Sequence, residues 1–152
     1  MDKKIDEQPV LPPVVRLYPA GIISLLTILT AFPAGYVLMI INWRRMGVKD
    51  RERTYIFGLL FSSLVSVLLI PFYARAGCGI SIINIAVGIY FYNEMTQALA
   101  DFGQRGNKYV MEKFFTGCLI GVLATVAWII TAGILISAIN LLTALLFSNS
   151  QR

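Results

Sequence analysis

The segregation of charge most constrains what this chain can become. Four apolar stretches (18–43, 55–74, 78–98 and 114–147) cover 101 of the 152 residues and contain a single charge, Glu94. The remaining 51 residues hold the other 20 charges. A water-soluble helical protein needs polar outer faces on its helices, so it cannot separate its charges in this way. The pattern predicts an all-α polytopic membrane protein. It excludes a soluble enzyme, a disulfide scaffold and a disordered chain.

The apolar stretches define the expected domain organisation. Residues 18–147 are predicted to form a four-helix transmembrane bundle with one span in each stretch. A flexible, proline-rich tail (1–17) precedes the bundle and a short tail (148–152) follows it. Charged residues make up 14% of the chain, against about a quarter in a soluble domain.

The first span contains a proline near its middle. Residues 20–42 correspond to about 35 Å of helix, enough to cross a bilayer with some tilt. Pro33 removes a backbone hydrogen bond, so we expect a kinked single helix, with Gly35 as a packing residue. The alternative is a re-entrant hairpin with its tip at 33–35.

The fourth span is too long for one upright crossing. Its 34 residues correspond to about 51 Å of helix, against a hydrocarbon core of about 30 Å. We favour one over-long helix; the alternative is a hairpin that breaks near 131–133. Gly117 and Gly121 form a row of small residues, with Thr125, that permits close helix packing.

Spans two and three are joined by a very short turn and are expected to form a tightly coupled antiparallel pair. The third span is the least apolar, so we expect it inside the bundle. Asn84 and Gly88 share a face there. Glu94 lies about 24 Å along this helix, near the inner membrane interface. We expect it to pair with a cation of an adjacent loop.

Two basic loops set the expected orientation. Loop 44–54 contains five cations, and loop 103–113 contains three; those of the first loop are Arg44, Arg45, Lys49, Arg51 and Arg53. Short loops rich in Lys and Arg stay cytoplasmic. With four spans, both termini are then outside, whereas a hairpin at either end moves the adjacent terminus inside. The basic residues are expected to contact anionic lipid head groups rather than nucleic acid.

No catalytic constellation is apparent. The chain has no His, and its two cysteines, Cys78 and Cys118, do not form a CxxC pair. The absence of His removes the commonest general base and the commonest metal ligand. We therefore expect no enzyme activity, no cofactor and no metal. The candidate functional polar residues are Glu94, Asn84 and Asn140, because polar groups inside membrane spans bridge helices or line pathways.

Several short motifs resemble a group of small uncharacterised bacterial multi-span membrane proteins. These motifs are the Tyr18-Pro19 start, the Pro33-Ala34-Gly35 step and the Asn42-Trp43-Arg44-Arg45-Met46-Gly47 exit. The chain departs from the group at Phe32 and Ala34, where Gly and Leu are usual. The resemblance implies a bacterial inner-membrane location and adds no activity.

The expected role is that of a non-catalytic integral membrane protein. It would serve as a structural or accessory subunit, or as a binding partner, in a bacterial membrane assembly with copies of itself or with other subunits. The competing expectation is a small oligomeric transporter or channel that uses Glu94 and intramembrane Asn, Ser and Thr residues.

Overall fold

A computed structural model describes the backbone over residues 14–76 and 79–149. This part of the chain is mostly helical, which confirms the all-α class. The elements follow in the order β1 (Val15–Leu17), α1 (Ala20–Leu29), α2 (Phe32–Arg45), α3 (Lys49–Ala76), α4 (Gly79–Gln104), β2 (Tyr109–Met111) and α5 (Phe114–Asn149). The predicted flexible tail before residue 14, the end of the chain after residue 149 and Cys78 lie outside the described residues.

The first apolar segment folds back on itself, so the prediction of one proline-kinked helix is wrong. It forms two separate helices, α1 and α2, which pack against each other. At the open end of this hairpin, the side chain of Asn42 bonds to the backbone of Tyr18. The hairpin of the alternative prediction is the observed backbone path, with its tip at residues 30–31 rather than 33–35.

Local geometry at the tip explains the break. Ala31 is extended, with φ 171° and ψ 165°, and separates the two helices. Pro33 stands in the first turn of α2, where its missing N–H costs no hydrogen bond. The hydroxyls of Thr27 and Thr30 each donate at 2.7 Å to carbonyls four residues earlier in α1. The proline therefore begins a new helix instead of bending a continuing one.

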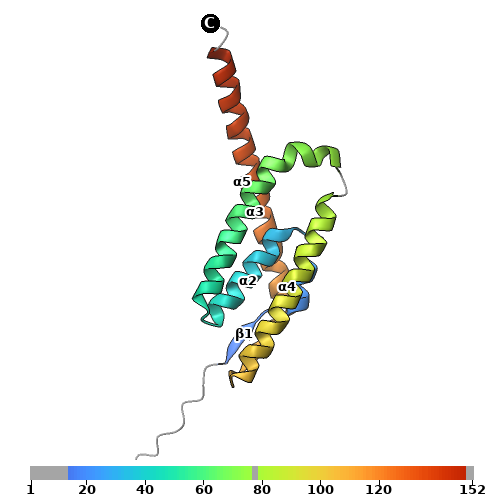
Figure 1. The fold of residues 1–152 in the computed structure, drawn as a ribbon, viewed down its shortest axis with the longest axis vertical. Helices are drawn as coiled ribbons and strands as arrows, with labels where there is room; N and C mark the ends of the chain where they lie inside the picture. Colours follow the sequence, from blue (N-terminus) through green and yellow to red (C-terminus); the bar gives the residue numbers. More distant parts are fainter. Residues whose placement is uncertain (1–13, 77–78, 150–152) are drawn as a thin grey trace, which may run out of the picture.

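α5 is one uninterrupted helix of 36 residues, which confirms the single-helix interpretation of the last apolar stretch. A helix of this length extends for about 54 Å. Its C-terminal half projects past the ends of α3 and α4 (Figure 1). Among the described residues, one segment, Phe114–Leu146, is both long and apolar enough to cross a membrane. The four-span bundle itself stays a prediction.

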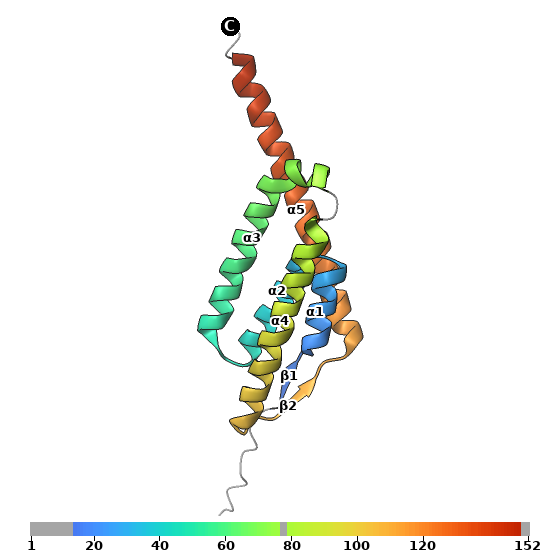
Figure 2. The same cartoon turned by 45° about the vertical axis from the view of Figure 1, so that its right-hand side comes forward.

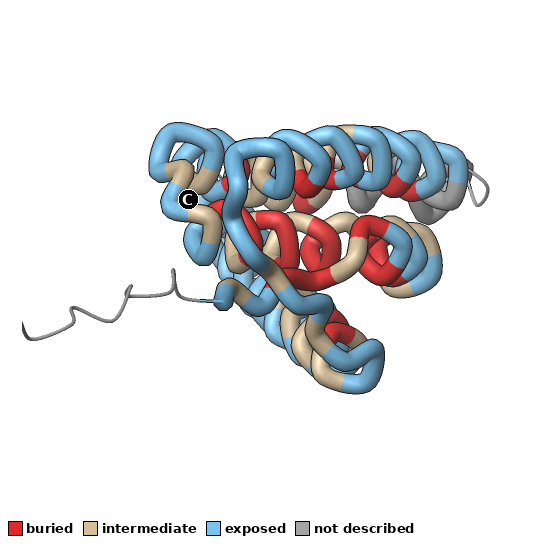
Figure 3. The backbone as a smooth tube through the Cα atoms, turned by 90° about the horizontal axis from the view of Figure 1, so that it is seen from below, coloured by how far each residue is buried: buried red, intermediate tan, exposed pale blue. Residues whose placement is uncertain are grey.

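The α1–α2 hairpin forms the centre of the molecule. α4 packs mainly on α1, α3 packs mainly on α2, and α5 lies along both helices of the hairpin (Figure 2). Buried backbone gathers at this centre, and the outer faces of the surrounding helices are exposed (Figure 3). The fully buried side chains include Ile23 of α1, Leu38 and Met39 of α2, and Phe91 and Met95 of α4.

Over their described residues, α3 and α4 have few close backbone contacts and meet through side chains near Glu94, so the predicted tight pairing of spans two and three is not observed there. Each helix instead uses a glycine to approach the hairpin. A Cβ at Gly58 of α3 would lie 2.7 Å from the ring of Tyr36, and one at Gly88 of α4 would lie 2.7 Å from Ile28 Cγ1. α3 and α4 thus each pack more closely on the hairpin than on each other.

β1 and β2 form a short parallel ribbon that the sequence analysis did not predict. Val15 pairs with Tyr109, and Leu17 pairs with Met111. Because β1 precedes α1 and β2 precedes α5, the ribbon places the beginnings of these two helices side by side. The described N-terminal segment therefore lies at the same end as loop 103–113, rather than opposite it as expected for four spans.

Candidate functional site

All the charged side chains that the structure describes lie at one end of the molecule. They come from β1, the end of α2, the beginning of α3, the C-terminal half of α4 and the segment that leads into α5. The basic ones are Arg16, Arg44, Arg45, Lys49, Arg51, Arg53, Arg105, Lys108 and Lys113. The acidic ones are Asp50, Glu52, Glu94, Asp101 and Glu112. This charged end contains the candidate functional site.

Glu94 lies at the centre of a polar cluster between α3 and α4. Its side chain is 14% exposed, and its Oε1 atom lies 3.2 Å from Nη1 of Arg51. The hydroxyl of Tyr55 donates a short hydrogen bond to the other carboxylate oxygen. Arg51 belongs to the first turn of α3 and to the basic loop, so it is the kind of partner that the sequence analysis expected for Glu94.

Aromatic side chains pack around Tyr55, next to this polar cluster. The Tyr55 ring packs on Tyr36, Phe91 and Trp43, with ring centroids 5.9, 5.7 and 6.3 Å apart. Tyr55 itself is 4% exposed. These ring contacts bury the Tyr55 side chain and direct its hydroxyl to the Glu94 carboxylate.

Two small cavities flank Arg51. The inner one, of about 140 Å³, is bordered by Tyr55, Tyr90 and Phe91 as well as by Arg51. The outer one, of about 200 Å³, lies between the ends of α2 and α4, and its walls include Trp43. Arg51 therefore lines both cavities, the inner one between the helices and the outer one at the charged end of the molecule.

Asn42 is a second buried polar centre, and it closes the hairpin. Its Oδ1 atom accepts from the Tyr18 N–H at 2.8 Å, and its Nδ2 donates to the Tyr18 carbonyl at 2.8 Å. The same Nδ2 lies 3.4 Å from the sulfur of Met95 in α4. One side chain thus imitates the two hydrogen bonds of a strand pair and joins β1, α2 and α4.

The other two predicted polar residues lie apart from Glu94. Asn84 is 8% exposed and is ten residues from Glu94 on α4, which corresponds to about 15 Å of helix. Asn140 is exposed on the distal half of α5. The structure therefore brings none of the three predicted polar residues together with another.

The predicted packing residues all face the hairpin or belong to it. Pro33 and Gly35 lie in the first turn of α2. Gly88 meets Ile28 of α1, while Gly117 meets Ile22 and Gly121 meets Leu26. A Cβ at Gly35 would lie 2.8 Å from the Phe91 ring.

The five cations of the basic loop have different surroundings. Arg51 pairs with Glu94, and Arg44 lies 3.9 Å from Glu52 at an exposed position. Arg45 donates to the Arg16 carbonyl at 2.8 Å and lies 3.4 Å from Glu112. The other two, Lys49 and Arg53, are exposed. Some cations of this loop therefore make contacts within the folded protein, whereas the others are free to contact solvent or lipid.

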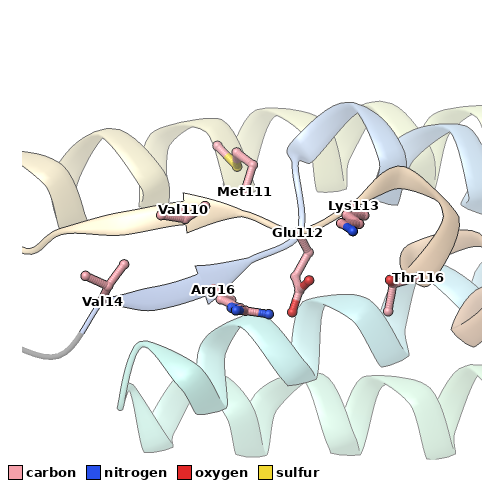
Figure 4. Close-up of a pocket in the computed structure, with 7 residues that line it drawn as sticks. All are labelled: Val14, Arg16, Val110, Met111, Glu112, Lys113 and Thr116. Atoms are coloured by element: carbon pink, nitrogen blue, oxygen red, sulfur yellow. The ribbon is translucent and has the colours of Figure 1, made fainter.

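Another cavity, of about 640 Å³, opens between the ribbon and the start of α5. Figure 4 shows the side chains of Arg16 and Glu112 close together on one side of the ribbon, with Thr116 of α5 nearby. Val14, Val110 and Met111 border the cavity on the ribbon side. Sequence reasoning missed this cavity because it exists only when β1 and β2 pair.

A third kind of recess lies in the apolar half. α2, α3 and α5 enclose an apolar groove of about 440 Å³ that contains Pro33, Leu60, Val67 and Trp128. Its walls are almost entirely aliphatic and aromatic, with Ser63 and Thr131 as the hydroxyl groups. Such a surface suits acyl chains or another apolar helix.

The described residues contain no group of three His, Cys, Asp or Glu side chains able to hold a metal ion. No family model matches the chain, and neither a curated protein nor a solved structure is significantly similar to it.

Proposed function

We propose that the chain is a non-catalytic integral membrane subunit that binds partner subunits in a bacterial inner-membrane assembly. In this proposal α3, α4 and α5 cross the bilayer, and the α1–α2 hairpin enters it from one side and returns. The hairpin helices contain 10 and 14 residues, or about 15 and 21 Å. They therefore reach only the middle of a hydrocarbon core of about 30 Å.

The distribution of charge supports this arrangement and its orientation. Nine of the described Lys and Arg side chains lie at the end that carries loops 44–54 and 103–113. Basic residues close to membrane spans stay in the cytoplasm. Both loops, and with them the segment 14–17, are then cytoplasmic, where the basic side chains meet anionic lipid head groups.

The observation that carries the subunit role is the uncovered distal half of α5. Its large side chains are exposed on every side, among them Ile134, Ile139, Leu142 and Leu146, at 48 to 64%. A bilayer core of about 30 Å covers only about 20 residues of an upright helix. Part of this apolar segment therefore extends beyond the lipid tails, and burial against a partner chain removes it from water.

Site-specific photo-crosslinking in native membranes tests this role. A photoreactive residue at Leu142 is expected to give a discrete adduct with a different membrane polypeptide. The same residue at Phe61, exposed at 71% on α3, serves as the control and is expected to give none. Adducts with lipid alone at both positions, or adducts only with a second copy of this chain, would contradict the accessory role.

A transporter that uses Glu94 is the second candidate, and the cavities beside Arg51 are the observation that favours it. In that case Glu94 would have to exchange its Arg51 partner for a proton or a cation. A flux assay in proteoliposomes compares the native chain with Glu94→Gln. Flux that disappears in the variant would favour transport over the accessory role.

A further inference from the structure

We propose that the outer cavity, at the charged ends of α2, α3 and α4, binds the headgroup of an amine-bearing phospholipid, the phosphoethanolamine type. This inference rests on the membrane placement proposed above. It adds a defined ligand and a defined site. Charges of both signs face this cavity, aromatic side chains form part of its wall, and it lies at the charged end of the bundle.

The cavity has the size and position of a headgroup site. Its volume of about 200 Å³ corresponds to about seven water molecules at their volume in the liquid. Trp43 of α2, Arg51 of α3 and Phe102 of α4 all border it. In the proposed orientation, this places the cavity at the cytoplasmic interface, where Trp and other aromatic rings are enriched.

Unpaired charges of both signs face the cavity. Asp101 lies in the last turn of α4 and Arg105 directly follows the helix, four residues later; both border the cavity. Residues at this spacing can pair across one turn of a helix. Within residues 14–76 and 79–149, however, no ion pair within 4.0 Å involves either side chain. A zwitterionic ligand satisfies both charges at once.

The third charged group, Arg51, is positioned by its neighbours. Its Nη1 atom holds Glu94 at 3.2 Å, and its guanidinium carbon lies 6.0 Å from the centre of the Trp43 ring. The side chain is still 57% exposed, so further donors of the guanidinium group remain available to a ligand. Trp43 adds a buried indole N–H that has no partner in the described part of the chain.

These groups match the chemistry of phosphoethanolamine. The phosphate oxygens accept charge-assisted hydrogen bonds from Arg51 and Arg105. The ammonium group donates to the Asp101 carboxylate and lies against the aromatic wall. A phosphoglycerol headgroup has no cation for Asp101, and a phosphocholine nitrogen has no N–H to donate. The site therefore prefers a primary amine.

Lipid binding to the purified full-length chain tests the inference. Native mass spectrometry in detergent compares phosphatidylethanolamine, phosphatidylglycerol and phosphatidylcholine with identical acyl chains. The native protein is expected to bind the ethanolamine lipid about tenfold more tightly than either alternative, which corresponds to about 1.4 kcal/mol. Asp101→Asn and Arg105→Gln are expected to remove this preference. Arg53→Gln, an exposed cation outside the cavity, is the matched control and is expected to keep it.

Three results would overturn the inference. They are equal binding of the three lipids, an unchanged preference in both cavity variants, and displacement of the lipid by soluble phosphoethanolamine at equal concentration. The variants change exposed side chains, and size-exclusion profiles identical to that of the native protein show that they fold. Carbonate extraction from membranes is measured in parallel. A protein that stays in the membrane without a lipid preference disproves this inference alone, whereas a protein that is extracted disproves the membrane placement.

Discussion

The side chain of Asn42 holds the backbone of Tyr18 through two hydrogen bonds of 2.8 Å, across 24 residues of sequence. Both groups are buried: Asn42 is 0% exposed and Tyr18 is 1% exposed. This pair fixes the two ends of the α1–α2 hairpin to each other. It also anchors the residue that directly follows β1 to α2.

Replacement of Asn42 by Ala is expected to destabilise the fold strongly. The variant leaves the buried N–H and carbonyl of Tyr18 without partners, and each such group costs about 1–3 kcal/mol. Unfolding in mixed detergent micelles should show a loss of about 2–4 kcal/mol. Asn140→Ala, at an exposed position of α5, should change the free energy of unfolding by less than about 0.5 kcal/mol. Equal stabilities of the two variants would refute this role of Asn42.

A methyl group at Gly88 is expected to disturb the contact between α4 and α1. It would lie 2.7 Å from Ile28 Cγ1 and 3.1 Å from the Ser24 carbonyl oxygen, and overpacking of this kind costs about 1–3 kcal/mol. Gly133→Ala is the control, because nothing lies within 4 Å of a Cβ there. Thermal unfolding in detergent should show a lower midpoint for Gly88→Ala and an unchanged or higher one for Gly133→Ala. A midpoint that is unaltered by Gly88→Ala would show that the two helices are not in close contact.

Tyr55 and Glu94 are expected to be energetically coupled. The Tyr55 hydroxyl donates to the carboxylate, and a hydrogen bond to a charged group contributes about 1.5–3 kcal/mol. A double-mutant cycle with Tyr55→Phe and Glu94→Gln isolates the interaction. We expect a coupling of about 1 kcal/mol or more, because the Gln side chain still accepts a weaker, neutral hydrogen bond. Additive effects of the two changes would mean that the hydrogen bond contributes nothing to stability.

Much of the architecture could be read from charge and hydropathy. The absence of charge from residue 114 to residue 147 predicted one long helix, and α5 is that helix. The isolated position of Glu94 near a membrane interface predicted a cationic partner, and the structure places Arg51 beside it. The long helix and the need of Glu94 for a cationic partner both follow from which residues are charged, and the sequence shows this directly.

The hairpin could not be decided from the sequence in the same way. Pro33 is compatible with a kink inside one helix, where the lost hydrogen bond bends the helix, and with the first turn of a new helix, where its N–H is not needed. The contact between Asn42 and Tyr18 closes the hairpin at its other end, and no local pattern reveals it. The ribbon escaped prediction for a similar reason, since strands of three residues are too short to show an alternating pattern.

The outer cavity was also invisible in the sequence. Asp101 and Arg105 read as ordinary polar residues near the end of a helix, and Arg51 reads as one of several loop cations. Their common cavity lies between the charged ends of α2, α3 and α4. Only the tertiary arrangement brings the three charges to one place.

The most direct test of the re-entrant hairpin is to determine on which side of the membrane the N-terminal segment lies. Single cysteines replace Val14, Lys49, Asn107 and Leu146 in a chain without Cys78 and Cys118, and intact cells are treated with an impermeant thiol reagent. The hairpin predicts that positions 14, 49 and 107 react only after permeabilisation, whereas position 146 reacts in intact cells. Labelling of position 14 in intact cells, with position 49 still protected, would show that the first segment crosses the membrane and would contradict the hairpin.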